Sequence, residues 1–267
     1  MSADIPSRRT RKHRTEHVTF PNAEGLMLAA SIDRPFEAPK AWAIVAHCFT
    51  CGRKSPGASR IAKRLADHGI ASLRLDFTGL GDSEGTFRLT TLSSNTTDLL
   101  SAYRYLKERE EAPTLLVGHS LGASASILAA PQMPTVKAIA VVGAPFRPDA
   151  AIKNHASDVC DPDETGTREI VIAGRQVSLG PEFLESVENF DAAAKLAELG
   201  RPLLILHAPK DSVVPFAEAI EMFQVATDDC SGAASLVCLD GADHRLTVSG
   251  SAQQVADIAA AWVTPYL

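Results

Sequence analysis

The sequence of 267 residues lacks several features that would assign its class directly. No stretch approaches the roughly 18–20 uninterrupted apolar residues that a membrane-spanning helix needs. The N-terminus has no apolar segment of the kind found in secretory signals, and no internal repeat or low-complexity segment is present. Hydrophobic residues nevertheless make up 45% of the chain, which is enough for a substantial core. We therefore expect a soluble, cytoplasmic protein without membrane contact.

Cysteine is scarce and unevenly placed. The chain has five cysteines, an odd number that does not fit the disulfide framework of a secreted domain. Cys48 and Cys51 form a C-x-x-C pattern, which is compatible with a thiol redox site or a zinc site. A second C-x-x-C or a Cys/His pair at zinc spacing is missing. We therefore expect no metal and no cofactor, and keep a thiol redox protein as an alternative.

Charge is unequally distributed along the chain. The net charge is −6, yet residues 1–17 carry five Lys or Arg against two acidic residues, so this segment is basic and the remainder is acidic. A basic arm can bind anions or nucleic acid, but terminal segments of this kind are usually solvated. An acidic body also argues against a nucleic-acid substrate. We expect a flexible basic tail over residues 1–14 and no nucleic-acid partner.

Predicted strands and helices alternate along most of the chain. This order is typical of a mostly parallel sheet with helices on both faces, the α/β class. The predicted strands cover residues 15–20, 26–32, 42–46, 71–76, 113–117, 136–143, 202–207 and 236–239, and the predicted helices include residues 92–109, 123–130 and 252–263. We expect one domain over residues 15–267.

One segment interrupts the alternation. Residues 146–190 are polar and irregular, and contain a predicted β-hairpin over 169–179, which turns at Gly174 and Arg175, followed by a short helix over 181–187. The segment follows the strand after the most informative motif of the chain, described next. We expect a small cap over an active site, with a surface excursion of no function as the alternative.

Residues 118–122 read Gly-His-Ser-Leu-Gly, between a predicted strand and a predicted helix. G-x-S-x-G in this context is the nucleophile elbow of α/β-hydrolases. The serine has to lie at the tip of a sharp turn, and the flanking glycines let strand and helix approach each other. Ser120 is therefore the predicted nucleophile.

A serine hydroxyl requires a base, and the base requires an acid that orients it. On this fold the chain order is Ser, then Asp or Glu, then His. Asp211 follows the strand over 202–207, and His244 follows the last predicted strand, so both lie at carboxyl ends of strands, where catalytic groups gather. Asp240 and Asp243 are competing acids. His119 is not expected to be the base, because the elbow directs it elsewhere, and His47 and His207 are expected to form structural hydrogen bonds near the site.

An oxyanion hole needs two backbone N–H groups directed at the developing negative charge. One is expected from Leu121, directly after the nucleophile, and the other from the loop after the third strand, where we assign it to Phe49. In this interpretation the sulfurs of the C-x-x-C pattern do not need to react.

Four segments together resemble a known family. They are His-Cys-Phe-Thr-Cys at 47–51, Asp-Phe-Thr-Gly-Leu-Gly-Asp-Ser-Glu-Gly at 76–85, the elbow at 118–122 and Gly-Ala-Asp-His at 241–244. The chain resembles α/β-hydrolases of the serine-aminopeptidase-like and esterase group, and more narrowly bacterial hydrolases associated with osmotically inducible peroxide-reductase-type domains. The resemblance implies a triad of Ser120, Asp211 and His244 with oxyanion donors at Phe49 and Leu121. Many relatives have glycine at the position of Cys48.

We expect a serine hydrolase that cleaves small or medium carboxylic esters through an acyl-enzyme. Thioesters and amides are also candidate substrates, because their hydrolysis uses the same triad and oxyanion hole. Phe146, Phe183 and Phe216 are the predicted pocket walls. The alternative function is a non-catalytic hydrolase-fold binding protein or a partner of a peroxide-handling enzyme. The oligomeric state, including a homo-oligomer, is left open.

Overall fold

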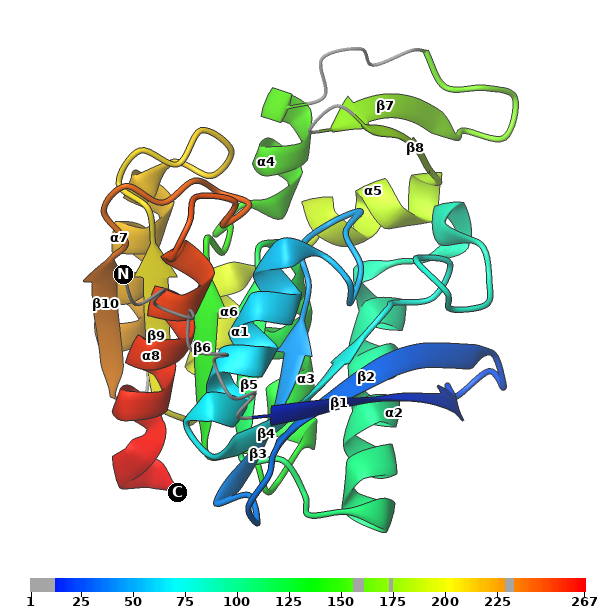
Figure 1. The fold of residues 1–267 in the computed structure, drawn as a ribbon. Helices are drawn as coiled ribbons and strands as arrows, with labels where there is room; N and C mark the ends of the chain where they lie inside the picture. Colours follow the sequence, from blue (N-terminus) through cyan, green and yellow to red (C-terminus); the bar gives the residue numbers. More distant parts are fainter. Residues whose placement is uncertain (1–12, 156–160, 173–174, 229–232) are drawn as a thin grey trace, which may run out of the picture.

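A central sheet organises the molecule. The computed structural model describes residues 13–155, 161–172, 175–228 and 233–267. Within these residues an eight-stranded sheet has the spatial order β1 (His13–Pro21), β2 (Met27–Pro35), β4 (Ile70–Leu75), β3 (Ala41–Ala46), β5 (Leu115–His119), β6 (Ala138–Val142), β9 (Leu203–His207) and β10 (Ala234–Cys238). The β1–β2 and β2–β4 pairs are antiparallel, whereas the other neighbours are parallel. The predicted mostly parallel sheet is confirmed (Figure 1).

Helices cover both faces of this sheet. Helices α1 (Pro56–Asp67) and α8 (Ser251–Val263) pack on one face, and α2 (Leu92–Arg109), α3 (Leu121–Ala129), α6 (Ala192–Ala197) and α7 (Phe216–Asp228) pack on the other. Successive side chains of a strand point to opposite faces. Ala43 and Val45 therefore pack in the core beneath α1 and α8, and Ile44 packs in the core on the opposite face. Because both faces are buried, the central strands are continuously apolar.

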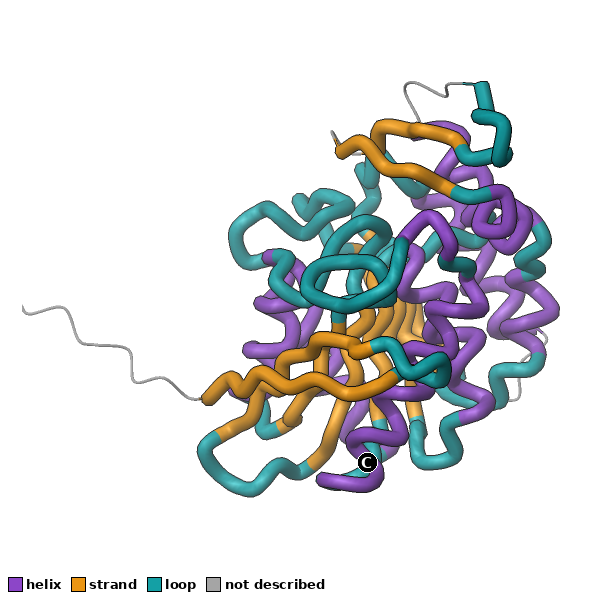
Figure 2. The backbone as a smooth tube through the Cα atoms, turned by 90° about the vertical axis from the view of Figure 1, so that its right-hand side faces the viewer, coloured by secondary structure: helices purple, strands orange, loops and turns teal. Residues whose placement is uncertain are grey.

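The segment between β6 and β9 forms the small cap. It contains α4 (Pro148–His155), the antiparallel hairpin of β7 (Arg168–Ile172) and β8 (Arg175–Leu179), and α5 (Pro181–Glu188). Figures 1 and 2 show these elements above the end of the sheet to which the parallel strands run. The predicted hairpin and short helix are confirmed. The predicted turn falls partly on Gly174, which lies outside the described residues, and β8 begins at the other turn residue, Arg175.

Hydrogen bonds attach the cap to the body. The Gly180 N–H donates to the Arg88 carbonyl over 3.1 Å, and the Leu92 N–H donates to the Ser186 hydroxyl over 3.0 Å. A side chain at position 180 would lie 2.3 Å from that Arg88 oxygen, so glycine is needed for the contact. The residue before α5 is thereby bonded to Arg88, and the last turn of α5 is bonded to the start of α2.

Two sequence expectations are corrected. The predicted tail over residues 1–14 is too long, because β1 begins at His13, and His13 and Arg14 pair with Pro35 and Arg34 of β2; residues 1–12 lie outside the described residues. Helices α4, α6 and α7 were not predicted. In α7 the buried positions include Ala219 and Ala226, whose small side chains give little apolar contrast to the helical period.

Candidate active site

Ser120 lies between β5 and α3 in a backbone conformation that L-residues rarely adopt. Its φ is 54° and its ψ is −126°. A non-glycine residue with positive φ costs free energy unless its surroundings fix it. Here the Ser120 N–H donates to the Val142 carbonyl over 2.8 Å, so the neighbouring strand β6 holds the turn. The turn presents the hydroxyl above the sheet, as the elbow motif predicts.

The two elbow glycines permit close backbone contacts. A Cβ atom at Gly118 would lie 2.5 Å from the Cα atom of Ala123, and one at Gly122 would lie 2.4 Å from the His47 carbonyl oxygen. Both distances are far below normal contact, and the obstructing atoms belong to backbone. Gly118 therefore lets α3 fold back onto β5, while Gly122 lets α3 lie against the end of β3.

Ser120, His244 and Asp211 form a continuous hydrogen-bonded chain. The distance between the Ser120 Oγ and the His244 Nε2 is 3.0 Å, and that between the His244 Nδ1 and the Asp211 Oδ2 is 2.8 Å. A carboxylate can only accept, so the Nδ1 carries the proton and the Nε2 accepts from the serine hydroxyl. The three residues follow the carboxyl ends of β5, β9 and β10, and Figure 1 labels these strands.

Asp211 is held ionised. Burial by itself raises the pKa of Asp211, but the hydrogen bond and charge of His244 lower it, as do the N–H groups of Val213 and Val214, and the pKa lies below its ordinary value. Those two N–H groups donate to the Asp211 Oδ1 over 2.8 and 2.9 Å. The carboxylate is therefore already oriented toward His244.

The competing acids have other partners or positions. Asp243 accepts from the backbone N–H of Thr247 over 2.6 Å and from that of Val248 over 3.3 Å, so it organises the loop that follows the base. Asp240 is exposed on the same loop. Neither carboxylate forms a hydrogen bond with His244, whose Nδ1 is occupied by Asp211.

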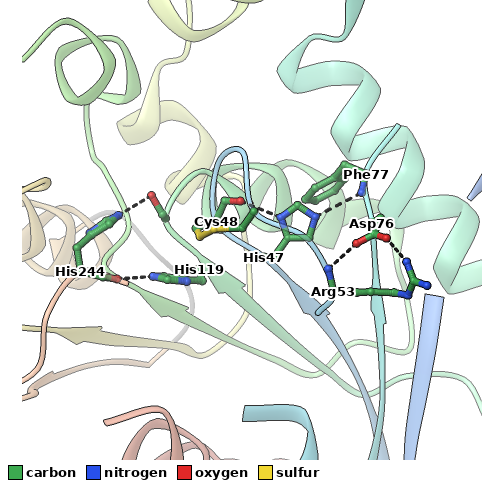
Figure 3. The surroundings of a disulfide bond; sticks show 9 residues. His47, Cys48, Arg53, Asp76, Phe77, His119 and His244 are labelled. Atoms are coloured by element: carbon green, nitrogen blue, oxygen red, sulfur yellow. Dashed lines mark hydrogen bonds and ion pairs between the residues drawn. A yellow bond between two sulfur atoms is a disulfide. The ribbon is translucent and has the colours of Figure 1, made fainter. Parts of the chain in front are cut away.

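The three remaining buried histidines near the site have structural hydrogen bonds. His119 donates from its Nε2 to the backbone carbonyl of His244 over 2.7 Å, and thus holds the loop that carries the base (Figure 3). Burial, aided by the charge of His244, lowers the pKa of His119 to about 3. The His207 Nε2 donates to the Val214 carbonyl over 2.9 Å, and the His47 Nδ1 donates to the Cys48 carbonyl over 2.8 Å. Burial lowers the pKa of both.

Phe49 and Leu121, the two predicted oxyanion donors, both lie in the wall of the cavity that contains Ser120. The N–H of Leu121 is the first of α3, and N–H groups of a first helical turn have no partner inside the helix. Phe49 belongs to the loop between β3 and α1, and within the described residues its N–H donates to no other group. Both residues line the same cavity as Ser120.

A buried ionic network anchors the loop that carries Phe49, and the sequence analysis did not find it. The Asp76 carboxylate at the end of β4 accepts from the backbone N–H of Arg53 over 2.5 Å, forms an ion pair with the Arg53 guanidinium, and accepts from the Asp82 N–H over 3.0 Å. Figure 3 shows this pair beside His47. The signal was the Gly-rich stretch 79–85, in which a side chain at Gly81 would collide with the Asp76 carboxylate.

Cys48 and Cys51 are joined by a disulfide in the same loop (Figure 3). The C-x-x-C pattern indicated a thiol redox site or a zinc site, and it did not predict this cross-link. Among the residues that the structure describes, no group of three or more His, Cys, Asp or Glu could hold a metal ion. None of the helices in this described part of the chain has the length and apolar character that crossing a membrane requires.

A cavity of about 430 Å³ opens over Ser120 and His244. Its walls come from the Phe49 loop, the start of α3, the cap helix α4 and the loops that carry Asp211 and His244. The apolar lining residues are Phe49, Leu121, Pro145, Pro148, Ala151, Ile152 and Val213. The volume falls in the range of small-molecule sites.

The three phenylalanines predicted as pocket walls do not line this cavity. Phe183 is fully buried and packs on Phe49 and Phe87, with ring centroids 5.3 and 6.1 Å apart. Phe216 packs edge-on against His207, and Phe146 packs against the core. Phe183 fills the joint between cap and body, and the prediction is wrong for all three.

Comparisons with known proteins agree with this fold. The family described as serine aminopeptidase, S33, matches residues 38–161. The esterase domain of a Rhodothermus marinus protein is 36% identical, with 95% of this chain and 99% of that one covered and a TM-score of 0.78. Est1E from Butyrivibrio proteoclasticus, in complex with ferulic acid, is 20% identical with a TM-score of 0.76 over 94% of this chain and 98% of that one, which shows the fold alone.

A mammalian enzyme is a further relative. The mitochondrial palmitoyl-protein thioesterase ABHD10 of Mus musculus is 28% identical over 202 residues, which are 73% of this chain. The chain spans 65% of the length of that curated relative, slightly less than two thirds. The predicted association with a peroxide-reductase-type domain stays a prediction.

His119 makes the stability of the protein depend on pH. Its folded pKa is about 3, whereas an unfolded histidine has a pKa of about 6.5. Between these values the unfolded chain binds a proton that the folded chain does not, so stability is complete above pH 6.5 and falls as the pH falls. Replacing His119 by Gln should reduce the loss of unfolding free energy between pH 7 and pH 5 by about 2 kcal/mol.

Urea unfolding at the two pH values measures this difference. His17→Gln, which removes an exposed histidine of β1, is the control and should retain the wild-type dependence. An equal loss of stability in wild type and His119→Gln would contradict the assignment of a buried neutral imidazole.

Proposed function

The chain belongs to the α/β-hydrolase family, and on that premise we propose that it is a serine hydrolase that cleaves carboxylic esters through an acyl-enzyme. The observation that carries the proposal is the hydrogen-bonded chain from the Ser120 Oγ through His244 to the Asp211 carboxylate. Such a chain activates a hydroxyl that is otherwise a weak nucleophile at neutral pH.

In the acylation step, the Ser120 Oγ attacks the ester carbonyl carbon while the His244 Nε2 takes the hydroxyl proton. Asp211 stabilises the imidazolium that forms. The tetrahedral intermediate places its oxyanion toward the N–H groups of Phe49 and Leu121. His244 then gives its proton to the leaving alcohol, and Ser120 is left as an acyl ester.

Deacylation repeats the sequence with water in place of the serine. His244 takes a proton from the water, the resulting hydroxide attacks the acyl carbonyl, and the proton returns to the Ser120 Oγ as the acid departs. Apart from this water, the groups that react in the cycle belong to the chain or to the substrate.

The cavity supports an apolar substrate of small to medium size. Its lining is mostly apolar, and α4 of the cap supplies Ala151 and Ile152 on the side away from the sheet. The relative ABHD10 is named as a palmitoyl-protein thioesterase, which keeps thioesters beside esters as substrates of the same machinery. We also propose that the protein acts in the cytoplasm.

The triad is tested by substitution. Ser120→Ala should abolish both ester hydrolysis and labelling by a fluorophosphonate, read by intact mass. Asp211→Asn should lower kcat by about 10⁴-fold, because the imidazole loses its orientation and tautomer. Asp240→Asn, which neutralises an exposed acid on the loop before His244, is the matched control and should keep wild-type turnover.

Full turnover in Ser120→Ala would contradict the mechanism. A folded wild type that neither hydrolyses esters nor takes the fluorophosphonate would favour the non-catalytic binding protein.

The cap helix should set the length of the acyl chain. Ile152→Trp narrows the cavity, so kcat/KM for p-nitrophenyl octanoate relative to the acetate should fall at least about tenfold. Lys153→Trp places the same bulk at an exposed neighbouring position of α4, where the side chain is 64% exposed, and should leave the ratio unchanged. The same ratio in wild type and Ile152→Trp would show that the acyl chain does not lie along α4.

A further inference from the structure

The disulfide between Cys48 and Cys51 lies in the wall of the substrate cavity. Both residues line the cavity together with Ser120. Cys51 is half-buried and Cys48 is 8% exposed, so Cys51 is the more exposed residue of the pair. The hydrolytic mechanism uses neither sulfur.

We propose that Cys51 is a thiol-exchange site, at which a low-molecular-weight thiol opens the disulfide from the cavity and thereby lowers hydrolytic turnover. The effect on turnover rests on the proposed function, whereas the exchange itself does not.

The exchange is a substitution at sulfur. The thiolate of the incoming thiol attacks the Cys51 Sγ, a new bond forms between the two sulfurs, and the Cys48–Cys51 bond breaks. Cys48 leaves as a thiolate and takes up a proton. A second thiol then attacks the outer sulfur of the mixed disulfide and releases the Cys51 thiol. The small thiol ends as its own disulfide, and the two cysteines are reduced.

The cross-link closes the turn that carries the Phe49 N–H. The Cys51 N–H donates to the Cys48 carbonyl over 3.1 Å, and the two Cα atoms are 5.4 Å apart, which are the features of a β-turn. Inside this turn Thr50 has a φ of 57°, a left-handed conformation that a β-branched residue rarely adopts. A disulfide across such a turn removes competing conformations of the loop.

The anchors on either side of the turn do not replace the cross-link. His47 is held before the turn by its buried ring, and Arg53 is held after it by Asp76. These contacts fix the ends of the loop, and the Phe49 ring packs on Phe183, so reduction leaves the fold intact and its effect falls on the backbone of residues 48–51. The Phe49 N–H is the group in this segment that the hydrolytic cycle needs. Loss of one oxyanion donor lowers kcat far more than KM, because the donor acts in the transition state.

The test compares two redox states of one protein. A background in which Cys160, Cys230 and Cys238 are all replaced by Ser leaves only the pair. One sample is left oxidised, a second is reduced with dithiothreitol, and a third is reduced and then alkylated with iodoacetamide. All three are freed of reagents before measurement. Intact mass counts the modified cysteines, and hydrolysis of p-nitrophenyl acetate gives kcat and KM.

Reduction should lower kcat at least about tenfold with little change in KM, and reoxidation of protein that was not alkylated should restore it. The double variant Cys48→Ser with Cys51→Ser should show the low kcat of the reduced protein, and neither reduction nor reoxidation should change that kcat. Equal kcat in the oxidised and reduced states, or a pair that dithiothreitol does not reduce, would overturn the proposal.

Single variants test which sulfur exchanges. With oxidised glutathione, Cys48→Ser, which retains Cys51, should form a mixed disulfide at least about tenfold faster than Cys51→Ser, because thiol exchange depends on access. Faster reaction at Cys48 would overturn the assignment to Cys51. Intact mass detects the mixed disulfide without any hydrolysis. A protein that neither hydrolyses esters nor takes the fluorophosphonate would therefore contradict the proposed function, and the mass measurement would still show whether Cys51 exchanges.

Discussion

The close backbone contact between the start of α3 and the end of β3 is the constraint on which the site depends. Gly122 allows it, since any side chain there would collide with the carbonyl oxygens of His47 and Ala46. The contact has two consequences at once. It places the start of α3 beside the loop that carries Phe49, and it fixes the turn that holds Ser120 at the end of the sheet. The nucleophile and the proposed oxyanion donors are thus placed by packing, before any substrate arrives.

Further contacts hold the Phe49 loop and the loop of His244 in place. The ionic network of Arg53 and Asp76 holds the loop from the side of β4, while Phe183 of the cap packs on Phe49 from above. On the other side, His119 joins the elbow to the loop of His244 through a single hydrogen bond. The base, the nucleophile and the oxyanion loop are therefore connected through the body of the protein, and the cap touches the loop through its buried aromatic side chain.

The sequence was sufficient where the fold itself dictates position. Ser120, Asp211 and His244 each follow a strand of a parallel sheet, so chain order and strand ends place them at one edge, and the structure brings them within hydrogen-bond distance. It was insufficient where direction matters: Phe183 and Phe216 lie near the site but point into the core. Two cysteines three residues apart do not by themselves predict a cross-link. The segment at 76–85 did not identify the partner of Asp76, because Arg53 lies 23 residues away in sequence.

A crystal structure with a boronic acid or phosphonate bound to the Ser120 Oγ would test the central claim most directly. The account predicts that one oxygen of the tetrahedral adduct lies about 2.7–3.1 Å from both the Phe49 and Leu121 nitrogens, with the His244 Nε2 near another oxygen. An adduct oxygen directed away from these N–H groups, or a reagent bound elsewhere than Ser120, would contradict it.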